Sequence, residues 1–402
     1  MRILFLTPQL PYPPQKGTAL RNWGLIQGLA EGHEVSLLSF TEPDKDATIA
    51  PPLSRACQRI ATVPQPARTR WERIQDMIAT ALPDMALRLG SQAYDRALRD
   101  WMADRSFDVV QIEGIELAPY VDTIRAAPQD TLVVFDDHNC EYVLQERTFL
   151  TDLTSPTRWP GAAYSFVQWR RLRRYEARVC QEADRVLAVS EADAEGLRDL
   201  VPGLGVRVIP NGIDTDVYRP STPDTNETAS QRLVFTGTMD FRPNVDAVLW
   251  FTHEVLPLIQ DEVPSVRFDV VGQRPHSRLQ PLGRNPSILL TGWVEDIKPY
   301  FERATVYVAP LRMGGGTRLK LLEAMSMEKP IVATSLGAEG YPVEDGRELL
   351  LADSPSDFAE AVVGLLQNRP RRLELGRVAR AFVEERYDWG VIVPQLETVY
   401  EE

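Results

Sequence analysis

The chain has 402 residues, of which 44% are hydrophobic and 25% are charged. This balance is typical of a globular protein with two or three domains, and it excludes a collagen, a coiled coil and a wholly disordered chain. The 44 basic residues are outnumbered by 57 acidic ones, which gives a net charge of −13. A net acidic chain argues against general nucleic-acid binding, so we expect no nucleic-acid partner.

Cysteine usage and the start of the chain indicate a cytoplasmic protein. The three cysteines, Cys57, Cys140 and Cys180, cannot all pair, and they form no Cys-x-x-Cys or Cys/His cluster. The sequence therefore predicts neither a disulfide framework nor a zinc site, as in a reducing compartment. The first apolar run, residues 3–6, is too short for a signal peptide. We also expect no membrane-spanning segment, because no run of about eighteen apolar residues occurs.

Short apolar runs alternate with segments of helical period in the first half of the chain. Residues 2–7 form the first run, a helical segment follows at 19–30, and a second run at 34–40 completes a strand–helix–strand unit. Three further runs, continuous as in parallel strands buried on both faces, lie at 108–112, 131–136 and 185–189.

A second series of the same kind follows a break. A run at 206–209 leads into Pro-Asn-Gly-Ile-Asp at 210–214, and the Pro/Ser/Thr/Asn-rich stretch 219–231 is predicted to be a surface loop or linker. Beyond it, a helix is predicted at 244–259. Strands are predicted at 233–237, 267–272, 287–292, 305–309 and 330–334.

Two such series predict an α/β fold of two Rossmann-like, doubly wound domains that face a cleft. We expect an N-terminal domain at 1–205 and a C-terminal domain at 206–385. The chain breaks at Asp388-Trp389-Gly390, and a last helix at about 386–402 is expected to pack back on the first domain. Ligands of such sheets bind at the carboxyl ends of the strands, so the residues that follow each strand are the functional candidates.

The sharpest feature is a run of three glycines, Gly314, Gly315 and Gly316, between a predicted strand and a predicted helix. Bare backbone amides at a helix N-terminus form an anion site, because only glycine lets phosphate oxygens approach so closely. Thr317 is the expected N-cap residue of that helix. Glu323 lies on the helix where its carboxylate could accept hydrogen bonds from ribose hydroxyls. The basic residues that could neutralise a diphosphate are Arg312, Arg318 and Lys320.

An alternative interpretation of this segment stays open. The three glycines could form a simple tight turn, and Lys320 with Glu323 could be an ordinary surface pair worth about 0.2–0.5 kcal/mol. The chain has no Gly-x-x-x-x-Gly-Lys-Ser/Thr sequence, and no Gly-x-Gly-x-x-Gly follows its first strand. Both absences argue against a P-loop nucleoside triphosphatase and a dinucleotide-dependent oxidoreductase.

Further motifs stand in a fixed order around the glycines. They are Leu-Glu-Ala-Met at 322–325 with Pro-Ile-Val-Ala-Thr at 330–334, Val-Ile-Pro-Asn-Gly-Ile-Asp at 208–214, Gly-Trp-Val at 292–294 and Gly-Ala-Glu-Gly at 337–340. Together they resemble the retaining glycosyltransferases of family 4, which have the GT-B fold. The resemblance implies that a sugar passes from a nucleotide diphosphate sugar to the hydroxyl of a glycan or lipid-linked glycan, with retention of anomeric configuration, in polysaccharide biosynthesis. It implies no metal and no cofactor besides the nucleotide sugar, which is the donor substrate.

The resemblance also assigns roles to individual residues. It places His138, Lys320 and Arg242 at the reaction, with His138 beside the transferred sugar. The donor-binding residues that it implies are Gly17, Gly237, Val294, Arg312, Gly314, Gly315, Gly316, Thr317, Arg318 and Glu323.

Two positions depart from the family pattern. Gly315 stands where the family usually has the first of two glutamates, and loop 237–244 has Arg242 but not the lysine that usually follows such an arginine. Lys320 or Arg318 would then take the role of that lysine. Gly315 keeps open the alternative of a non-catalytic nucleotide-sugar-binding subunit, and an epimerase or phosphorylase of the same fold is a second alternative.

Two loops of the first domain contain candidate residues. Gly17 follows the first strand, although its proline-rich loop could equally be a rigid turn. His138 lies at the carboxyl end of a predicted strand, where a core histidine need not lie. We interpret the adjacent Asp136 and Asp137 as solvated acids at the strand end rather than as a metal site.

Segment 159–178 is rich in aromatic residues and contains five arginines, although the chain as a whole is acidic. Amphipathic helices of this kind lie on anionic membranes, which would suit a lipid-linked acceptor at the cytoplasmic face of the membrane. A second basic and aromatic stretch at 68–73 favours the same interpretation. Alternatively, the helix packs its aromatic side chains inward and pairs its arginines with local acids.

Overall fold

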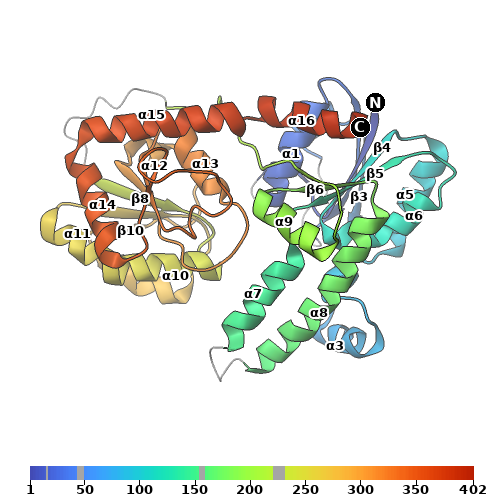
Figure 1. Cartoon of the computed structure of the whole chain (residues 1–402), viewed down its shortest axis with the longest axis horizontal. Coiled ribbons are helices and arrows are strands. Elements are labelled where there is room, and N and C mark those ends of the chain that lie inside the picture. Colours follow the sequence, from blue (N-terminus) through green and yellow to red (C-terminus); the bar gives the residue numbers. More distant parts are fainter. Residues whose placement is uncertain (15–16, 43–48, 154–158, 221–230) are drawn as a thin grey trace. The chain divides into compact units, whose positions relative to one another are not determined.

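The computed structural model describes residues 1–14, 17–42, 49–153, 159–220 and 231–402. Its contacts divide the chain into two compact units, Met1–Asn211 together with Ile392–Glu402, and Gly212–Val391. Most of the predicted linker at 219–231 lies outside the described residues. Each unit is built on its own sheet with helices around it (Figure 1).

The first unit contains a parallel sheet of seven strands in the order β3-β2-β1-β4-β5-β6-β7. The strands are β1 Arg2–Thr7, β2 Glu34–Thr41, β3 Arg59–Pro64, β4 Val109–Glu113, β5 Leu132–Asp137, β6 Arg185–Ala188 and β7 Val206–Val208. The strand order reverses between β1 and β4, which is the switch point where doubly wound folds place their ligands. The predicted apolar runs are buried because helices cover both faces of the sheet.

The helices of the first unit lie mostly between consecutive strands. They are α1 Gly17–Leu29, α2 Pro51–Ala56, α3 Arg70–Ala79, α4 Asp84–Arg88, α5 Gln92–Asp104, the 3-10 helix η1 Ile115–Tyr120, α6 Val121–Arg125, α7 Glu141–Leu153, α8 Trp159–Glu182 and α9 Glu191–Leu200. The last helix, α16 Trp389–Glu401, joins this unit through its C-terminal part. Its Glu397 carboxylate lies 3.0 Å from Nε2 of His33, and its Tyr400 hydroxyl donates to Oε1 of Gln111.

The second unit contains a parallel sheet of six strands in the order β10-β9-β8-β11-β12-β13. The strands are β8 Arg232–Thr236, β9 Arg267–Val271, β10 Ile288–Leu290, β11 Val306–Ala309, β12 Ile331–Ala333 and β13 Leu350–Leu351. Its helices are α10 Arg242–Trp250, the π-helix η3 Phe251–Val255, α11 Leu256–Glu262, the 3-10 helix η4 Ser277–Arg284, α12 Lys298–Arg303, α13 Leu319–Ser326, α14 Pro355–Gln367 and α15 Arg369–Arg386. The order reverses between β8 and β11, so this unit repeats the architecture of the first.

Three details differ from the sequence-based expectations. Strand β7 pairs with β6 in the first sheet, so the first unit extends to Asn211 rather than to residue 205. Strands β3 and β13 were not expected, because most side chains of β3 are only half-buried at the sheet edge and β13 has only two residues. The single helix expected at 244–259 is interrupted by the π-turn η3, because Pro257 has no N–H to continue the α-helical ladder.

No helix in the part of the chain that the structure describes is both long and apolar enough to cross a lipid bilayer. All three cysteines are buried as free thiols.

Candidate functional site

The three glycines connect β11 to α13 in the second unit. Gly314 and Gly316 have φ angles of 104° and 74°, in the left-handed region that favours glycine. The helix begins at Leu319 with Arg318 as its N-cap residue, and no side chain caps its first turn. The expectation that Thr317 is the N-cap residue is therefore wrong, because the chain enters the helix one residue later. An uncapped helix start behind glycines retains the geometry of an anion site.

Lys320 lies in a tight polar pocket formed by three elements. Its ammonium donates to Oδ1 of Asn244 on α10 at 2.8 Å and lies 4.3 Å from the ring centroid of Phe235 on β8. A Cβ atom at Gly237 would lie 2.8 Å from the Lys320 Nζ and 2.7 Å from the Asn244 amide nitrogen, so a larger residue there would displace these side chains. Burial and the nearby charge of Arg318 lower the pKa of Lys320 to about 7.

Glu323 lies on the same helix as Lys320. The hydroxyl of Tyr218 donates to its Oε1 at 3.3 Å. Burial raises the pKa of Glu323 to about 7, although Lys320 and the Tyr218 hydrogen bond oppose the rise. Tyr218 is itself held in place, because its carbonyl accepts a hydrogen bond from the Ser326 hydroxyl at 2.6 Å. One helix therefore presents an ammonium and a carboxyl group that both titrate close to neutral pH.

The arginines expected at this site have different surroundings. Arg312 forms a two-point ion pair with Asp246 on α10, with distances of 3.1 and 3.2 Å. Arg318 donates through Nη1 to the carbonyl of Gly315, within the glycine loop. Arg242 is the exposed first residue of α10 and forms no ion pair with any residue that the structure describes. Arg318 and Lys320 thus lie together, whereas Arg312 is turned toward α10.

The remaining expected donor residues also belong to the second unit, except for Gly17. A Cβ atom at Gly314 would lie 3.3 Å from the Pro243 ring, so the glycine loop lies against the start of α10. Val294 is half-buried and packs against the core around α13. Gly17 is the first residue of α1 in the first unit. Asn244 and Tyr218 were not expected, because they reach Lys320 and Glu323 from distant parts of the sequence.

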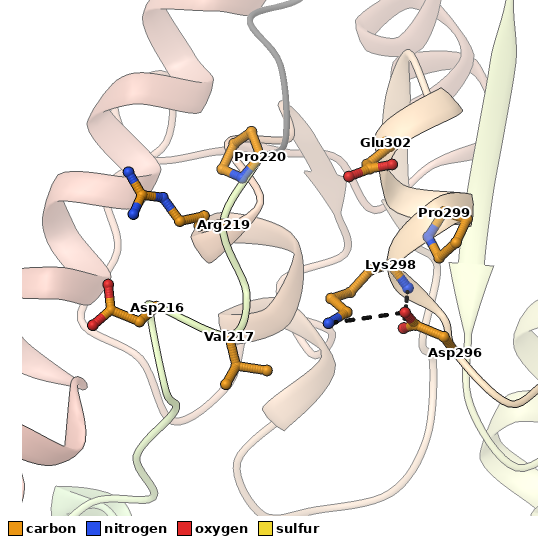
Figure 2. A pocket seen from close by; sticks show the side chains of 8 residues that line it. All are labelled: Asp216, Val217, Arg219, Pro220, Asp296, Lys298, Pro299 and Glu302. Atoms are coloured by element: carbon orange, nitrogen blue, oxygen red, sulfur yellow. Dashed lines mark hydrogen bonds and ion pairs between the residues drawn. The ribbon is translucent and has the colours of Figure 1, made fainter.

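A separate pocket of about 650 Å³ opens on the second unit (Figure 2). It contains both signs of charge, including Lys298, whose ammonium lies 3.8 Å from Asp296. The residues that line it are Asp216, Val217, Arg219, Pro220, Asp296, Lys298, Pro299 and Glu302. None of these is a residue that the sequence marked for donor binding, so this pocket is distinct from the glycine loop.

His138 follows β5 in the first unit and belongs to a buried charged cluster. Its Nε2 lies 2.7 Å from Oε2 of Glu113 on the neighbouring strand β4. Asp136 forms a two-point ion pair with Arg21 of α1, at 2.9 and 3.0 Å. Asp136 and Asp137 are both fully buried, so the expectation that they are solvated acids is wrong. Arg21 supplies the charge that allows Asp136 to be buried.

Glu113, Asp136 and His138 place metal-binding atom types within 4.8 Å of one another. Arg21 already engages both oxygens of Asp136, and its fixed positive charge would repel a cation. The three residues therefore belong to an ion-pair network rather than to a metal site. Burial opposes a positive charge on His138, whereas the Glu113 carboxylate favours it. The carboxylate outweighs burial, and the pKa of His138 is raised.

Two family models together match most of the chain. The model described as Glycosyltransferase Family 4 matches residues 17–217, and the model described as Glycosyl transferases group 1 matches residues 230–368. The chain belongs to glycosyltransferase family 4. This glycosyltransferase is 22% identical over 399 residues to an uncharacterized 44.6 kDa protein in the cps region of Klebsiella pneumoniae, with 96% of each chain covered. It is 31% identical over 201 residues to the phosphatidyl-myo-inositol mannosyltransferase of Mycobacterium leprae, covering 48% of this chain and 52% of that protein.

Solved structures share the fold of the glycosyltransferase over its whole length. Anabaena HepE, in complex with UDP and glucose, superposes with a TM-score of 0.69 at 15% identity, with 100% of both chains covered. Sucrose-phosphate synthase from Thermosynechococcus elongatus has a TM-score of 0.72 at 17% identity and covers 100% of this chain and 98% of its own. The expected fold of two Rossmann-like domains is confirmed.

Proposed function

We propose that this glycosyltransferase moves a sugar from a nucleotide diphosphate sugar to a hydroxyl of a glycan or lipid-linked glycan, with retention of anomeric configuration. The observation that carries the donor assignment is the site on α13, where Lys320 and Glu323 lie behind an uncapped helix start and a glycine loop. The relatives and solved structures that bind or transfer sugars support a nucleotide-sugar donor.

The site is suited to the charge that develops during transfer. As the bond to the sugar breaks, negative charge builds up on the departing diphosphate, and preorganised donors aimed at it lower the barrier. Backbone N–H groups of the glycine loop, the guanidinium of Arg318 and the ammonium of Lys320 would supply these donors. Arg242 directly precedes Pro243, which lies against the glycine loop. Its guanidinium would add a further positive charge near the diphosphate. Glu323 would hold the ribose, and the Val294 backbone would lie near the base.

Retention is proposed from the resemblance to retaining glycosyltransferases, and Gly315 leaves no carboxylate at that position to act as a nucleophile. With no side chain there to act as nucleophile, the departing phosphate would itself accept the proton of the incoming hydroxyl on the same face of the sugar. His138, in the first unit, would orient the transferred sugar. No metal is required, because the cationic side chains and backbone dipoles already stabilise the diphosphate.

Binding and turnover assays together test the function. UDP-, GDP-, ADP- and dTDP-sugars are screened by thermal shift, since a ligand of the folded state raises the melting temperature by mass action. The sugar that binds is then offered with glycan and lipid-linked acceptors, and the anomeric configuration of the product is read by NMR. Transfer with retention supports the proposal. Binding without transfer or hydrolysis would favour a non-catalytic subunit, and an inverted product would refute retention.

A peripheral contact with an anionic membrane is a second part of the proposal. Trp71 and Ile78 of α3 are 75% and 80% exposed, and Trp159 of α8 is 58% exposed. Helix α8 lies beside α7 and contacts α3 at one end of the first unit (Figure 1). Large aromatic and aliphatic side chains this exposed are typical of surfaces that insert into a lipid interface.

The arginines of α8 divide into two groups. Arg171 donates to the carbonyls of Met77 and Leu82, and Arg178 pairs with Glu182, so both serve the fold. The other three, Arg170, Arg173 and Arg174, are exposed and form no ion pair with a described residue. Neither sequence-based interpretation of this helix therefore holds for all five arginines. The three exposed ones are available to lipid phosphates.

Vesicle sedimentation tests the membrane contact. We expect binding to vesicles that contain phosphatidylglycerol and no binding to phosphatidylcholine alone, with loss on the change Trp159→Ser combined with Arg173→Gln and Arg174→Gln. Trp293→Ser is the matched control, because Trp293 is 66% exposed on the second unit. Equal binding of the wild type and the triple variant would refute the contact.

A further inference from the structure

A chain of buried hydrogen bonds runs from the last helix of the protein to His138. The Tyr400 hydroxyl donates to Oε1 of Gln111, and Nε2 of Gln111 donates to Oε1 of Glu113 at 2.6 Å. The other oxygen of Glu113 lies 2.7 Å from Nε2 of His138. Asn22 adds a further donor, because its amide nitrogen, turned toward Glu113, lies 2.6 Å from the same oxygen. Three side-chain nitrogens thus surround one fully buried carboxyl group, whose pKa is raised by burial and by the charge of Asp136.

Stability alone does not explain this network. Glu113 ends the central strand β4 and Gln111 lies two residues before it, and both are fully inaccessible, although apolar side chains would be less costly there. Replacing a buried charged network by apolar side chains is often neutral or stabilising. The network does orient one partly exposed side chain, that of His138. The His138 side chain is 14% exposed, and the Glu113 side chain that holds its Nε2 is not exposed at all.

We propose that Glu113 is a positioning residue that holds the His138 imidazole with Nε2 directed inward, so that Nδ1 is the nitrogen that meets a hydroxyl of the transferred sugar. This inference rests on the proposed sugar transfer. Gly114 lies beside Nδ1, since a Cβ atom at this position would be in van der Waals contact with it, at 3.8 Å. Gly114 has a φ angle of 91°, which a larger residue would adopt only with strain.

The charged groups around His138 come from β4, α1, η1 and α7, and from β5, the strand that His138 follows. Glu113 favours its protonated form most strongly, and Asp136 does so more weakly, whereas burial and Arg21 oppose it. Glu116 of η1 and Glu141 of α7 complete the charged surroundings. Because Glu113 is the dominant favourable partner, Glu113→Gln removes the largest of the effects that raise the pKa of His138.

The first experiment needs no substrate. The chain has only four histidines, so the imidazole resonances in a heteronuclear NMR titration can be assigned with His138→Gln. We expect Glu113→Gln to lower the midpoint of His138. Glu397→Gln is the matched control, since it changes a carboxylate that lies 3.0 Å from a different histidine of the same unit, His33, and should leave the midpoint of His138 unchanged. An unchanged His138 midpoint in Glu113→Gln would overturn the inference, whatever the enzyme transfers.

The second experiment asks whether Glu113 acts through His138. With the donor and acceptor found by screening, we expect Glu113→Gln to lower kcat about tenfold to hundredfold with little change in the KM for the donor. In the His138→Gln background the same change should cost nothing further. A full additional loss in the double variant, or an unchanged kcat in the single one, would overturn the positioning role. If Glu113→Gln does not fold, Glu113→Asp replaces it in the same cycle.

These two experiments separate the inference from the proposed function. A lowered His138 midpoint in an enzyme that transfers no sugar would contradict the function and leave the imidazole geometry standing. A retaining transferase whose kcat ignores Glu113 would confirm the function and refute the inference.

Discussion

Lys320→Met is expected to stabilise the fold and to abolish donor binding. The wild-type ammonium is held in a half-buried site beside Arg318, which lowers its pKa from 10.5 to about 7. Such a change corresponds to at most about 5 kcal/mol, since one pH unit is worth about 1.4 kcal/mol. Partial exposure screens this cost, and methionine forfeits the hydrogen bond to Asn244. We therefore expect the free energy of unfolding at neutral pH to increase by about 1–2 kcal/mol.

The pH dependence of this gain has a definite sign. The unfolded chain keeps the Lys320 proton up to the ordinary lysine pKa of 10.5, whereas the folded chain releases it near pH 7. The wild type therefore bears the full cost below pH 7, and the cost shrinks as the pH rises from 7 toward 10.5. The advantage of the methionine variant should fall over the same range.

Urea unfolding at about pH 6 and about pH 9 measures this difference. Lys298→Met is the control, because its ammonium lies at the surface, 3.8 Å from Asp296. A parallel thermal-shift titration with the nucleotide sugar should show a rise in melting temperature for the wild type and for the control, but not for Lys320→Met. A variant that is less stable than the wild type, or equally advantaged at both pH values, would refute the reasoning.

Three further predictions concern the same site. Affinity for the nucleotide sugar, measured by calorimetry, should peak near pH 7. A bound diphosphate favours protonated Lys320 and a bound ribose favours ionised Glu323, and the pKa of each is about 7 in the free protein. An affinity that does not change with pH would contradict this. Glu323→Gln should weaken donor binding about tenfold and abolish the loss of affinity below pH 7 while leaving the loss above pH 7. If the affinity of this variant still falls below pH 7, a group other than Glu323 causes that fall. Gly237→Ala should destabilise the second unit by about 1–3 kcal/mol and weaken donor binding, because its Cβ would lie 2.8 Å from the Lys320 Nζ; wild-type melting and titration curves would show that the contact is unimportant.

Most strands were predictable from the sequence, because strands buried on both faces are continuous apolar runs and show no alternation of apolar and polar residues. It missed β3 and β13, which are half-buried edge strands. It also assigned β7 to the second domain, because a run of three residues does not reveal which sheet it joins. Helix periodicity did not reveal the π-turn at 251–255, since the apolar stripe continues through it.

The candidate site was predictable only where its residues are close in sequence. Lys320 and Glu323 share one helix, so their spacing alone placed them together. Asn244 and Tyr218 contact them from 76 and 105 residues away, and nothing local marks either residue. The same holds for Glu113, which meets His138 only because β4 and β5 pair in register with Glu113 opposite Asp136.

A crystal structure with the bound nucleotide sugar tests the central claim most directly. The account predicts diphosphate oxygens within hydrogen-bonding distance of Lys320 Nζ and of the backbone N–H groups at 314–318, with the ribose hydroxyls on the Glu323 carboxylate. A diphosphate bound elsewhere on the second unit, for example in the pocket beside Lys298, with the glycine loop empty, would contradict it.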